Sequence, residues 1–202
     1  ATLANLQPAL DWTGEAGYEA DGLNPETGDR STNFIYRVKY TDMDNDAPLS
    51  GYPRLYILKG GTTLQLLTMN YVSGSNAAGA VYSTSAVLSG LGADYSYHFE
   101  AYDMWSATAT GAPAALADAP DVLNNAPALS WAGGTGYTAD GLNPDAGDRA
   151  ALFTYRVKYT DSDNDAPLSG YPRVYILKGG ATVQLLTMSY ISGSNAAGAV
   201  YS

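Results

Sequence analysis

The clearest strand signal in the chain is Phe34-Ile35-Tyr36-Arg37-Val38-Lys39-Tyr40-Thr41. Every second side chain is large and apolar, so Phe34, Tyr36, Val38 and Tyr40 fall on one face of an extended segment. The polar side chains that alternate with them fall on the other face. The stretch therefore predicts a half-buried β-strand whose aromatic face points into a core.

The same stretch returns 119 residues later as residues 153–160. Residues 5–83 align with residues 124–202 without a gap, and 60 of the 79 paired positions are identical. The second copy keeps the apolar face, whereas Ile35 on the other face becomes Thr154. The chain is therefore one repeat unit followed by most of a second.

Turns and further short strands are predicted before and after this strand. Residues 14–33 and 74–79 are rich in turn-forming residues, and there is no convincing amphipathic helix. Strands are predicted at residues 8–12, 34–42, 54–59, 63–71, 80–88, 94–103 and 106–111. About seven short strands separated by turns indicate an all-β fold, an antiparallel β-sandwich.

Residues 88–101, Leu-Ser-Gly-Leu-Gly-Ala-Asp-Tyr-Ser-Tyr-His-Phe-Glu-Ala, resemble the fibronectin type III and wider immunoglobulin-like pattern. In that pattern a tyrosine near the start of the sixth strand bonds back to the backbone, and here it would be Tyr95 or Tyr97. The resemblance implies tandem immunoglobulin-like antiparallel β-sandwiches. The expected domains are a complete repeat at residues 1–116, a linker at 117–126 and an incomplete repeat at 127–202.

The amino-acid composition limits the binding partners and the location that the chain is expected to have. Twenty acidic against ten basic side chains give a formal charge of -10, which disfavours nucleic acid and anionic membranes as partners. There is no cysteine, so disulfides and thiolate sites are excluded. No apolar run reaches the roughly 18 residues of a membrane span, so no membrane insertion is expected. Abundant Gly, Ala, Ser, Thr and Tyr resemble exported bacterial surface proteins, which favours an extracellular, secreted or cell-surface location.

An acidic loop follows the first strong strand. It carries the candidate metal ligands Asp42, Asp44, Asn45 and Asp46, which the second copy repeats as Asp161, Asp163, Asn164 and Asp165. Closely spaced carboxylates repel one another unless a cation lies among them, and Ca²⁺ accepts about six to eight oxygen ligands from such loops. The loop resembles the acidic calcium-binding segments of cadherin-type repeats. The alternative is a solvated turn whose Asp and Asn side chains cap backbone amides.

Three further carboxylates are candidate ligands. In an immunoglobulin-like domain the ends of the second and sixth strands share a pole, so Asp103 is expected to join the loop at 42–46. By the same reasoning, Asp118 and Asp121 of the expected linker would face the acidic loop of the second copy. Residues 21–29 contain further acidic groups, but their Gly, Asn and Pro residues favour an ordinary loop over a second ion site.

Other residues are candidates for contacts with ligands. Tyr52, Tyr56 and Tyr102 are expected at the surface, where they would stack on carbohydrate or contact another subunit. His98 is the only histidine and has no nucleophile elbow beside it, and the four glutamates show no pair typical of glycosidases. We therefore expect no enzymatic activity.

The second copy has no counterpart of residues 84–111. A sandwich without these strands would expose Phe153, Tyr155, Val157 and Tyr159 and leave a sheet edge unpaired. Two expectations follow: the chain is a window of a longer array, or a neighbouring chain donates the strands. Together these features predict a calcium-stabilised structural or adhesive repeat protein (a filament, surface layer or adhesin stalk) whose partners are copies of itself and a glycan or cell-surface ligand. The alternative is a carbohydrate-binding accessory module of a secreted enzyme.

Overall fold

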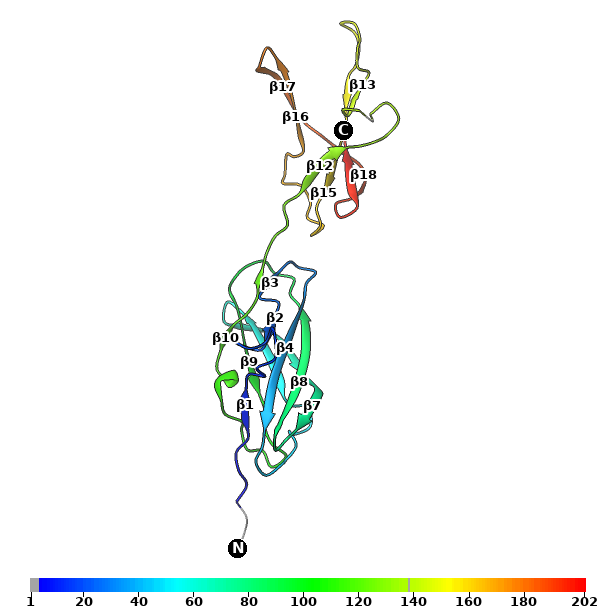
Figure 1. The fold of residues 1–202 in the computed structure, drawn as a ribbon. Coiled ribbons are helices and arrows are strands. Elements are labelled where there is room, and N and C mark those ends of the chain that lie inside the picture. The colour runs from blue at the N-terminus through cyan, green and yellow to red at the C-terminus, as the bar shows by residue number, and fades with distance from the viewer. Residues whose placement is uncertain (1–3, 138) are drawn as a thin grey trace. The chain divides into compact units, whose positions relative to one another are not determined.

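The computed structural model describes residues 4–137 and 139–202. These residues form strands, loops and one short 3₁₀ helix, η1 (Ala112–Ala114), so the predicted all-β fold is confirmed. The chain divides into two compact units, Ala1–Leu123 and Asn124–Ser202 (Figure 1). In the described part of the chain, no helix is long and apolar enough to cross a membrane.

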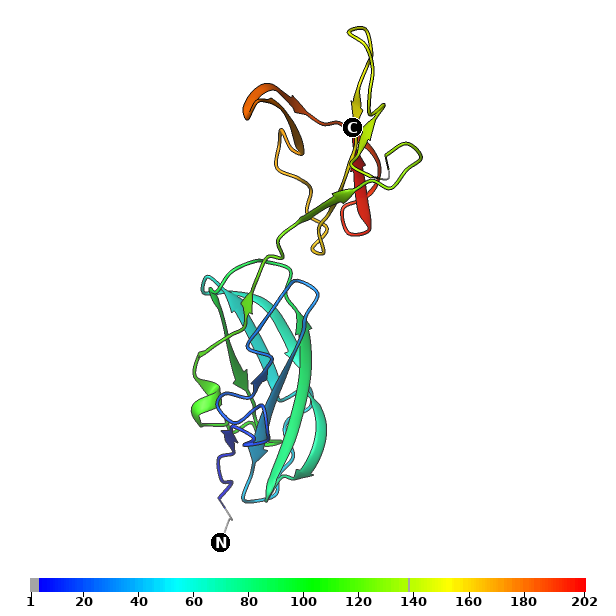
Figure 2. The ribbon, with the colours of Figure 1, turned by 45° about the horizontal axis from the view of Figure 1, so that its top comes forward.

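The first unit is a sandwich of two antiparallel sheets (Figures 1 and 2). One sheet has the order β1 (Ala9–Asp11), β4 (Asn33–Thr41), β8 (Gly79–Val87) and β7 (Asn70–Ser75), with β2 (Leu23–Asn24) also paired to β4. The other has the order β10 (Ala117–Asp118), β9 (Tyr95–Glu100), β5 (Arg54–Lys59) and β6 (Thr62–Thr68). A short parallel pair joins β3 (Thr27–Gly28) to β11 (Asp121–Val122).

The core lies between these two sheets. The predicted inner face of β4 is fully buried, because Phe34, Tyr36, Val38 and Tyr40 belong to one cluster with residues of β5 and β9. The rings of Tyr36 and Tyr97 meet edge to face, with centroids 5.1 Å apart. Burying a side chain of this size stabilises the fold by roughly 1.5–3 kcal/mol, so the alternation in this one strand contributes heavily to the sandwich.

Tyr95 bonds to the backbone a few residues before it in the chain. Its hydroxyl donates to the Gly90 carbonyl (2.8 Å) and accepts from the Gly90 amide (3.1 Å). Tyr97 has a different role, since its hydroxyl donates to the carbonyl of Asp21 at 2.5 Å. Of the two tyrosines, Tyr95 therefore bonds within its own corner, and Tyr97 bonds to a distant loop.

The predicted strand at residues 63–71 is wrong, because the chain changes sheets in the middle of it. β6 ends at Thr68 and β7 begins at Asn70, and the two belong to different sheets. Met69 between them is buried, and its amide donates to the Pro53 carbonyl at 3.0 Å. Because buried Met69 continues the apolar pattern of the segment, the sequence does not reveal that the chain changes sheets there.

The seventh strand is also displaced. Residues 106–111 make only isolated bridges, such as Tyr102 to Thr108, and β10 takes the position beside β9. The expected linker at 117–126 is corrected accordingly: β10 and β11 pair with strands of the first unit. These strands are two residues long, too short for a periodic signal.

The described residues of the second unit, 124–137 and 139–202, form one four-stranded antiparallel sheet and two separate strand pairs. The sheet has the order β12 (Ala128–Trp131), β15 (Val157–Thr160), β19 (Gly198–Tyr201) and β18 (Tyr190–Ser194). The pairs are β13 (Leu142–Asn143) with β14 (Thr154–Tyr155), and β16 (Arg173–Lys178) with β17 (Ala181–Thr187).

The inner face of the second unit is largely open. Leu10 is 0 % exposed in the first unit, whereas its counterpart Leu129 is 62 % exposed. Phe153 is exposed as expected, and Tyr155 and Val157 are half-buried. Tyr159 differs from the expectation because it is buried against Tyr201, with ring centroids 6.4 Å apart.

Candidate cation sites at the acidic loops

Asp42 closes the end of β4 and organises the acidic loop. Its side chain is buried, and Oδ1 accepts hydrogen bonds from the amides of Asp44 (2.9 Å) and Asp46 (3.2 Å). The Tyr40 hydroxyl donates to Asp42 Oδ2 at 3.4 Å and to the Asp46 carbonyl at 3.3 Å. The capping role that the sequence offered as the alternative therefore holds for Asp42.

The three aspartates also converge. One carboxylate oxygen from each of Asp42, Asp44 and Asp46 lies within 4.8 Å of the others, a spacing at which they could hold a metal ion. Asn45 does not join them through its side chain, because its Oδ1 accepts the amide of Ala77 (3.2 Å). Its backbone has a φ of 65°, which turns the chain between the second and third aspartates.

Asp103 reaches the same pole from the end of β9, as the sequence predicts. It is fully buried and forms a bridge with Pro48, and its Oδ1 accepts the amides of Trp105 (2.9 Å) and Ala107 (2.8 Å). Its Oδ2 accepts the Asn5 side-chain amide at 2.6 Å. Burial opposes ionisation of this group, but these hydrogen bonds outweigh burial and place the Asp103 pKa below its ordinary value.

The carboxylates of the first unit's cluster raise the proton affinity of Asp46. The pKa of Asp46 is raised, first by burial and then by the charges of Asp42, Asp44 and Asp103, with a hydrogen bond from Trp105 partly opposing the rise. A surface pocket of about 550 Å³ adjoins these groups, lined by Ala4, Asn5, Asp44, Asp46 and Trp105. A cation in this pocket would relieve the repulsion that raises the Asp46 pKa.

The leading segment of each unit, residues 4–6 or 124–126, is tied to this cluster. In the first unit the Leu6 amide donates to Asp44 Oδ2 at 2.6 Å. In the second, the Asn125 amide donates to Asp163 Oδ2, also at 2.6 Å. The two bonds are equivalent although Leu6 and Asn125 differ, because the backbone makes them.

The second unit repeats the loop geometry. Asp161 is buried, and its Oδ1 accepts the amides of Asp163 (2.9 Å) and Asp165 (3.3 Å). These three aspartates also bring carboxylate oxygens within 4.8 Å of one another. Asn164 again faces away, since its Oδ1 accepts the Ala196 amide at 3.1 Å. The acidic loop thus has the same hydrogen-bonded geometry in both units.

Asp118 and Asp121 lie in β10 and β11 of the first unit. The charge of Asp118 acts on Glu26, whose pKa is raised by burial, by Asp21 and by Asp118. The Asp121 amide donates to the Glu26 carbonyl at 3.0 Å. Both residues are thus placed beside the loop at 21–29, and their contribution to the second acidic loop stays a prediction.

The three candidate tyrosines gather around Glu100 on the outer face of the β10-β9-β5-β6 sheet. The hydroxyls of Tyr56 and Tyr102 donate to Glu100 Oε2 (2.8 Å) and Oε1 (3.1 Å). The ring of Tyr52 meets that of Tyr102 edge to face at 5.0 Å, and Tyr56 stacks on His98 at 4.7 Å.

The partners of these tyrosines were not predicted from the sequence. The guanidinium of Arg54 lies 4.2 Å from the Tyr52 ring centre. The hydrogen bonds to Glu100 raise the pKa of both Tyr56 and Tyr102. Burial lowers the pKa of His98, against the opposing charge of Glu100. The alternation in β5 and β9 placed these side chains outward, but the pairing of the two strands was needed to bring them together.

Comparison with known proteins adds no family assignment, since no protein-family model matches the chain and no curated protein matches it.

Proposed function

We propose that this chain is an extracellular structural or adhesive repeat protein, part of a filament, surface layer or adhesin stalk, stabilised by Ca²⁺. The observation that carries the proposal is the hydrogen bond from the leading segment to the second aspartate of the cluster, made at 2.6 Å in both units. An ion bound by this cluster would fix the segment through which the chain enters each unit. The proposed role is mechanical and non-catalytic.

The donor chemistry favours Ca²⁺. The cluster offers only carboxylate oxygens, from a loop whose Asp44 is exposed and whose Asp46 is half-buried, so water can complete the coordination shell. Mg²⁺ demands a near-ideal octahedron and gives up its own water reluctantly, which suits this loop less well. Soft metals would call for thiolate or imidazole ligands, which the loop does not contain.

The strand order supports the immunoglobulin-like part of the proposal. Immunoglobulin constant-type domains pair strands A, B, E and D in one sheet and C, F and G in the other. Taking β1, β4, β5, β6, β7, β8, β9 and β10 as strands A, B, C, C′, D, E, F and G gives the sheets A-B-E-D and C′-C-F-G. The contact between Tyr95 and Gly90 supports the same family.

Two measurements on the complete chain test the proposal. Isothermal titration calorimetry should detect calcium binding that weakens in Asp44→Asn and Asp163→Asn, and disappears when both are changed. Because the chain has no cysteine, spin labels can be placed at Thr63→Cys and Thr182→Cys, exposed positions that correspond in the two repeats. Calcium should narrow the distribution of distances between the labels. Binding without any narrowing would contradict the mechanical role, and absence of binding would contradict the calcium site.

The tyrosine cluster supports a second candidate, a carbohydrate-binding module. Tyr52, Tyr56 and Tyr102 present partly exposed rings beside Glu100, and aromatic rings with a nearby carboxylate suit a sugar. Tyr171 and Tyr175 of the second unit are the matched control, because residues 124–202 lack the counterparts of Tyr102 and Glu100. Glycan-array binding lost in Tyr52→Ala but kept in Tyr171→Ala would favour this function over the structural one.

A further inference from the structure

One long segment of this acidic chain carries no charge at all. None of the 20 acidic and ten basic side chains lies within residues 60–93. Residues 179–202, which correspond to residues 60–83, are also uncharged. The net charge of -10 therefore lies entirely outside these segments, and they are where two copies of the chain can approach with the least repulsion.

In the first unit this segment forms one side of the sandwich. β6 is the last strand of one sheet and β7 is the last strand of the other, with only Met69 between them in the chain. Both sheets therefore end on the same side, which lies opposite β1 in Figure 1. The Gln65 side chain donates to the Val87 carbonyl at 3.1 Å, so the end of β8 lies beside β6. We call the surface of β6, β7 and Val87 the lateral side.

Large apolar side chains of the lateral side are exposed to solvent. Each of the following is at least 45 % exposed: Leu64, Leu66, Tyr71, Val72 and Val87. In the second unit the counterparts of the first four are exposed as well, namely Val183, Leu185, Tyr190 and Ile191. Exposed apolar side chains that gather on one surface mark a site of interaction.

The opposite side of the sandwich carries charge. Its edge strands are β1 and β10, and each ends in an exposed aspartate, Asp11 or Asp118. Charged side chains and prolines on edge strands prevent association between proteins. β6 and β7 contain neither. The lateral side thus lacks the protection that the opposite side has.

The backbone of the lateral side is irregular. The pairing of β5 with β6 shifts between Ile57 and Leu58, and the pairing of β7 with β8 shifts between Tyr71 and Ser73. Such irregularities turn an edge away from an incoming strand. The Tyr71 hydroxyl also donates to the Gly74 carbonyl at 2.7 Å, so this acceptor of β7 is already used. A partner would therefore pack against side chains of this surface and would not extend either sheet.

We propose that the lateral side is the surface through which a second copy of this chain docks. Copies related by a two-fold axis meet through the same surface, so a charge near the axis faces its like. The lateral side avoids this repulsion, because β6 and β7 carry no charge. Each chain has this side in both units and can therefore contact two others. A filament or surface layer needs such contacts between copies, so the docking surface rests on the proposed function and extends it.

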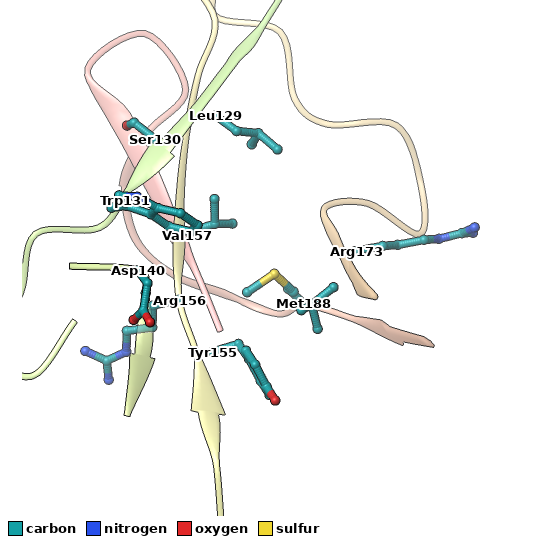
Figure 3. Close-up of a pocket in the computed structure, with 11 residues that line it drawn as sticks. Leu129, Ser130, Trp131, Asp140, Tyr155, Arg156, Val157, Arg173 and Met188 are labelled. Carbon is teal, nitrogen blue, oxygen red and sulfur yellow. The ribbon is translucent and has the colours of Figure 1, made fainter. Parts of the chain in front are cut away.

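A different apolar surface provides a control. A pocket of about 640 Å³ on the inner face of the second unit is lined by residues that include Leu129 and Trp131 (Figure 3). Their counterparts in the first unit, Leu10 and Trp12, belong to or pack against its core. This face therefore corresponds to core surface, whereas the lateral side is exposed in both units.

Sedimentation velocity of the complete 202-residue chain in EDTA tests the proposal. We expect reversible self-association with a dissociation constant of about 10 μM to 1 mM, as for small interfaces. Leu66→Glu should weaken the association at least tenfold, because like charges would then meet across the contact, and adding Leu185→Glu should weaken it further. Added salt should strengthen the association of the wild-type chain by screening its net charge, whereas a contact between opposite charges would weaken.

Two control variants add the same charge elsewhere. Leu116→Glu changes an exposed residue beside β10, and Leu129→Glu changes the pocket of the inner face. Both should associate as the wild-type chain does. A wild-type chain that stays monomeric, or an equal loss in all variants, would contradict the proposal. Loss in Leu129→Glu but not in Leu66→Glu would assign the contact to the inner face instead.

Disulfide crosslinking locates the contact without changing an apolar residue. Because the chain has no cysteine, Asn70→Cys at the start of β7 should give crosslinked dimers on oxidation, whereas Ala115→Cys beside β10 should not. Both positions are exposed. Equal crosslinking of the two variants, or none in Asn70→Cys, would refute the lateral contact. This comparison decides the matter if Leu66→Glu disturbs folding.

Calcium separates this proposal from the proposed function. No carboxylate belongs to the lateral side, so the association should be the same in EDTA and in calcium. Association that requires calcium would assign the contact to the acidic loops and rule out the lateral side. A chain that binds calcium but stays monomeric would overturn the lateral side alone, and a chain that associates without binding calcium would overturn the calcium site alone.

Discussion

Substitutions at Asp42 separate its capping role from a role in binding calcium. Asp42→Ala removes the acceptor of two backbone amides, at 2.9 and 3.2 Å, while Asp42→Asn keeps an oxygen in the same place and removes the charge. Hydrogen bonds to a charged group contribute roughly 1.5 kcal/mol each at the low end. Without calcium, Asp42→Ala should therefore lower the free energy of unfolding by about 3 kcal/mol. Asp42→Asn should lower it by no more than about 1 kcal/mol, because lost charge also relieves repulsion.

Calcium widens the difference in stability between Asp42→Asn and the wild-type chain. A ligand at about 100 times its dissociation constant adds roughly 2.7 kcal/mol to the wild-type chain. Asp42→Asn should lose a large part of this gain, since a carboxylate ligand has become a neutral amide. The stability of Asp42→Ala should be low with or without the ion.

Differential scanning calorimetry with EDTA and with calcium measures these differences. For a unit of this size 1 kcal/mol corresponds to roughly 3–5 °C, so Asp42→Ala should unfold about 10 °C lower in EDTA. Hydrogen exchange in β4 identifies the transition of the first unit, and Asp161→Ala and Asp161→Asn are the matched pair in the second. If both Asp42 variants were equally destabilised in EDTA, the capping argument would be wrong. If Asp42→Asn kept the full calcium gain, Asp42 would be a cap and not a ligand.

Three other predictions follow from single contacts. The pKa of Asp46 lies above its ordinary value of 3.8. Without calcium, the stability that protonated Asp46 contributes is therefore full below pH 3.8 and is lost as the pH rises through the pKa of the folded state. The same proton competes with calcium, so calorimetry should show weaker calcium binding at about pH 4.5 than at about pH 7. Gly22→Ala would bring a Cβ into a clash with the Arg37 carbonyl oxygen of β4, at a φ of +76°. Denaturant unfolding should show a loss of about 3 kcal/mol or more in the free energy of unfolding. The control is Gly14→Ala, which also has a positive φ but open space around the Cβ, and should lose about 1 kcal/mol. Tyr95→Phe removes two hydrogen bonds to Gly90 and should cost about 1–2 kcal/mol in the same assay.

The sequence predicts the parts of the fold that local periodicity controls. The alternation at residues 34–41 identified β4 and its buried face, because one register of a strand buries every second side chain. It did not predict the change of sheet at Met69, since a buried methionine fits the pattern of either strand. Nor did it predict β10, whose two residues are ordered by pairing with β9.

The candidate cation site also has features that the sequence predicts and features that it does not. The acidic residues and their convergence with Asp103 follow from composition and from the shared pole of two strands. The orientation of the Asn45 side chain could not be predicted in this way, because it bonds to Ala77, a residue of the turn between β7 and β8. A contact between residues 32 positions apart in the chain cannot be inferred from the spacing of residues within one loop.

The two repeats distinguish what is local from what depends on a partner strand. The acidic loop has the same geometry in both units, since Asp42 and Asp161 each cap two amides at similar distances. Burial of the inner face is not reproduced, because Leu129 is exposed where Leu10 is buried. The three aspartates of the acidic loop therefore converge through contacts within the loop, whether or not the inner face of the unit is covered.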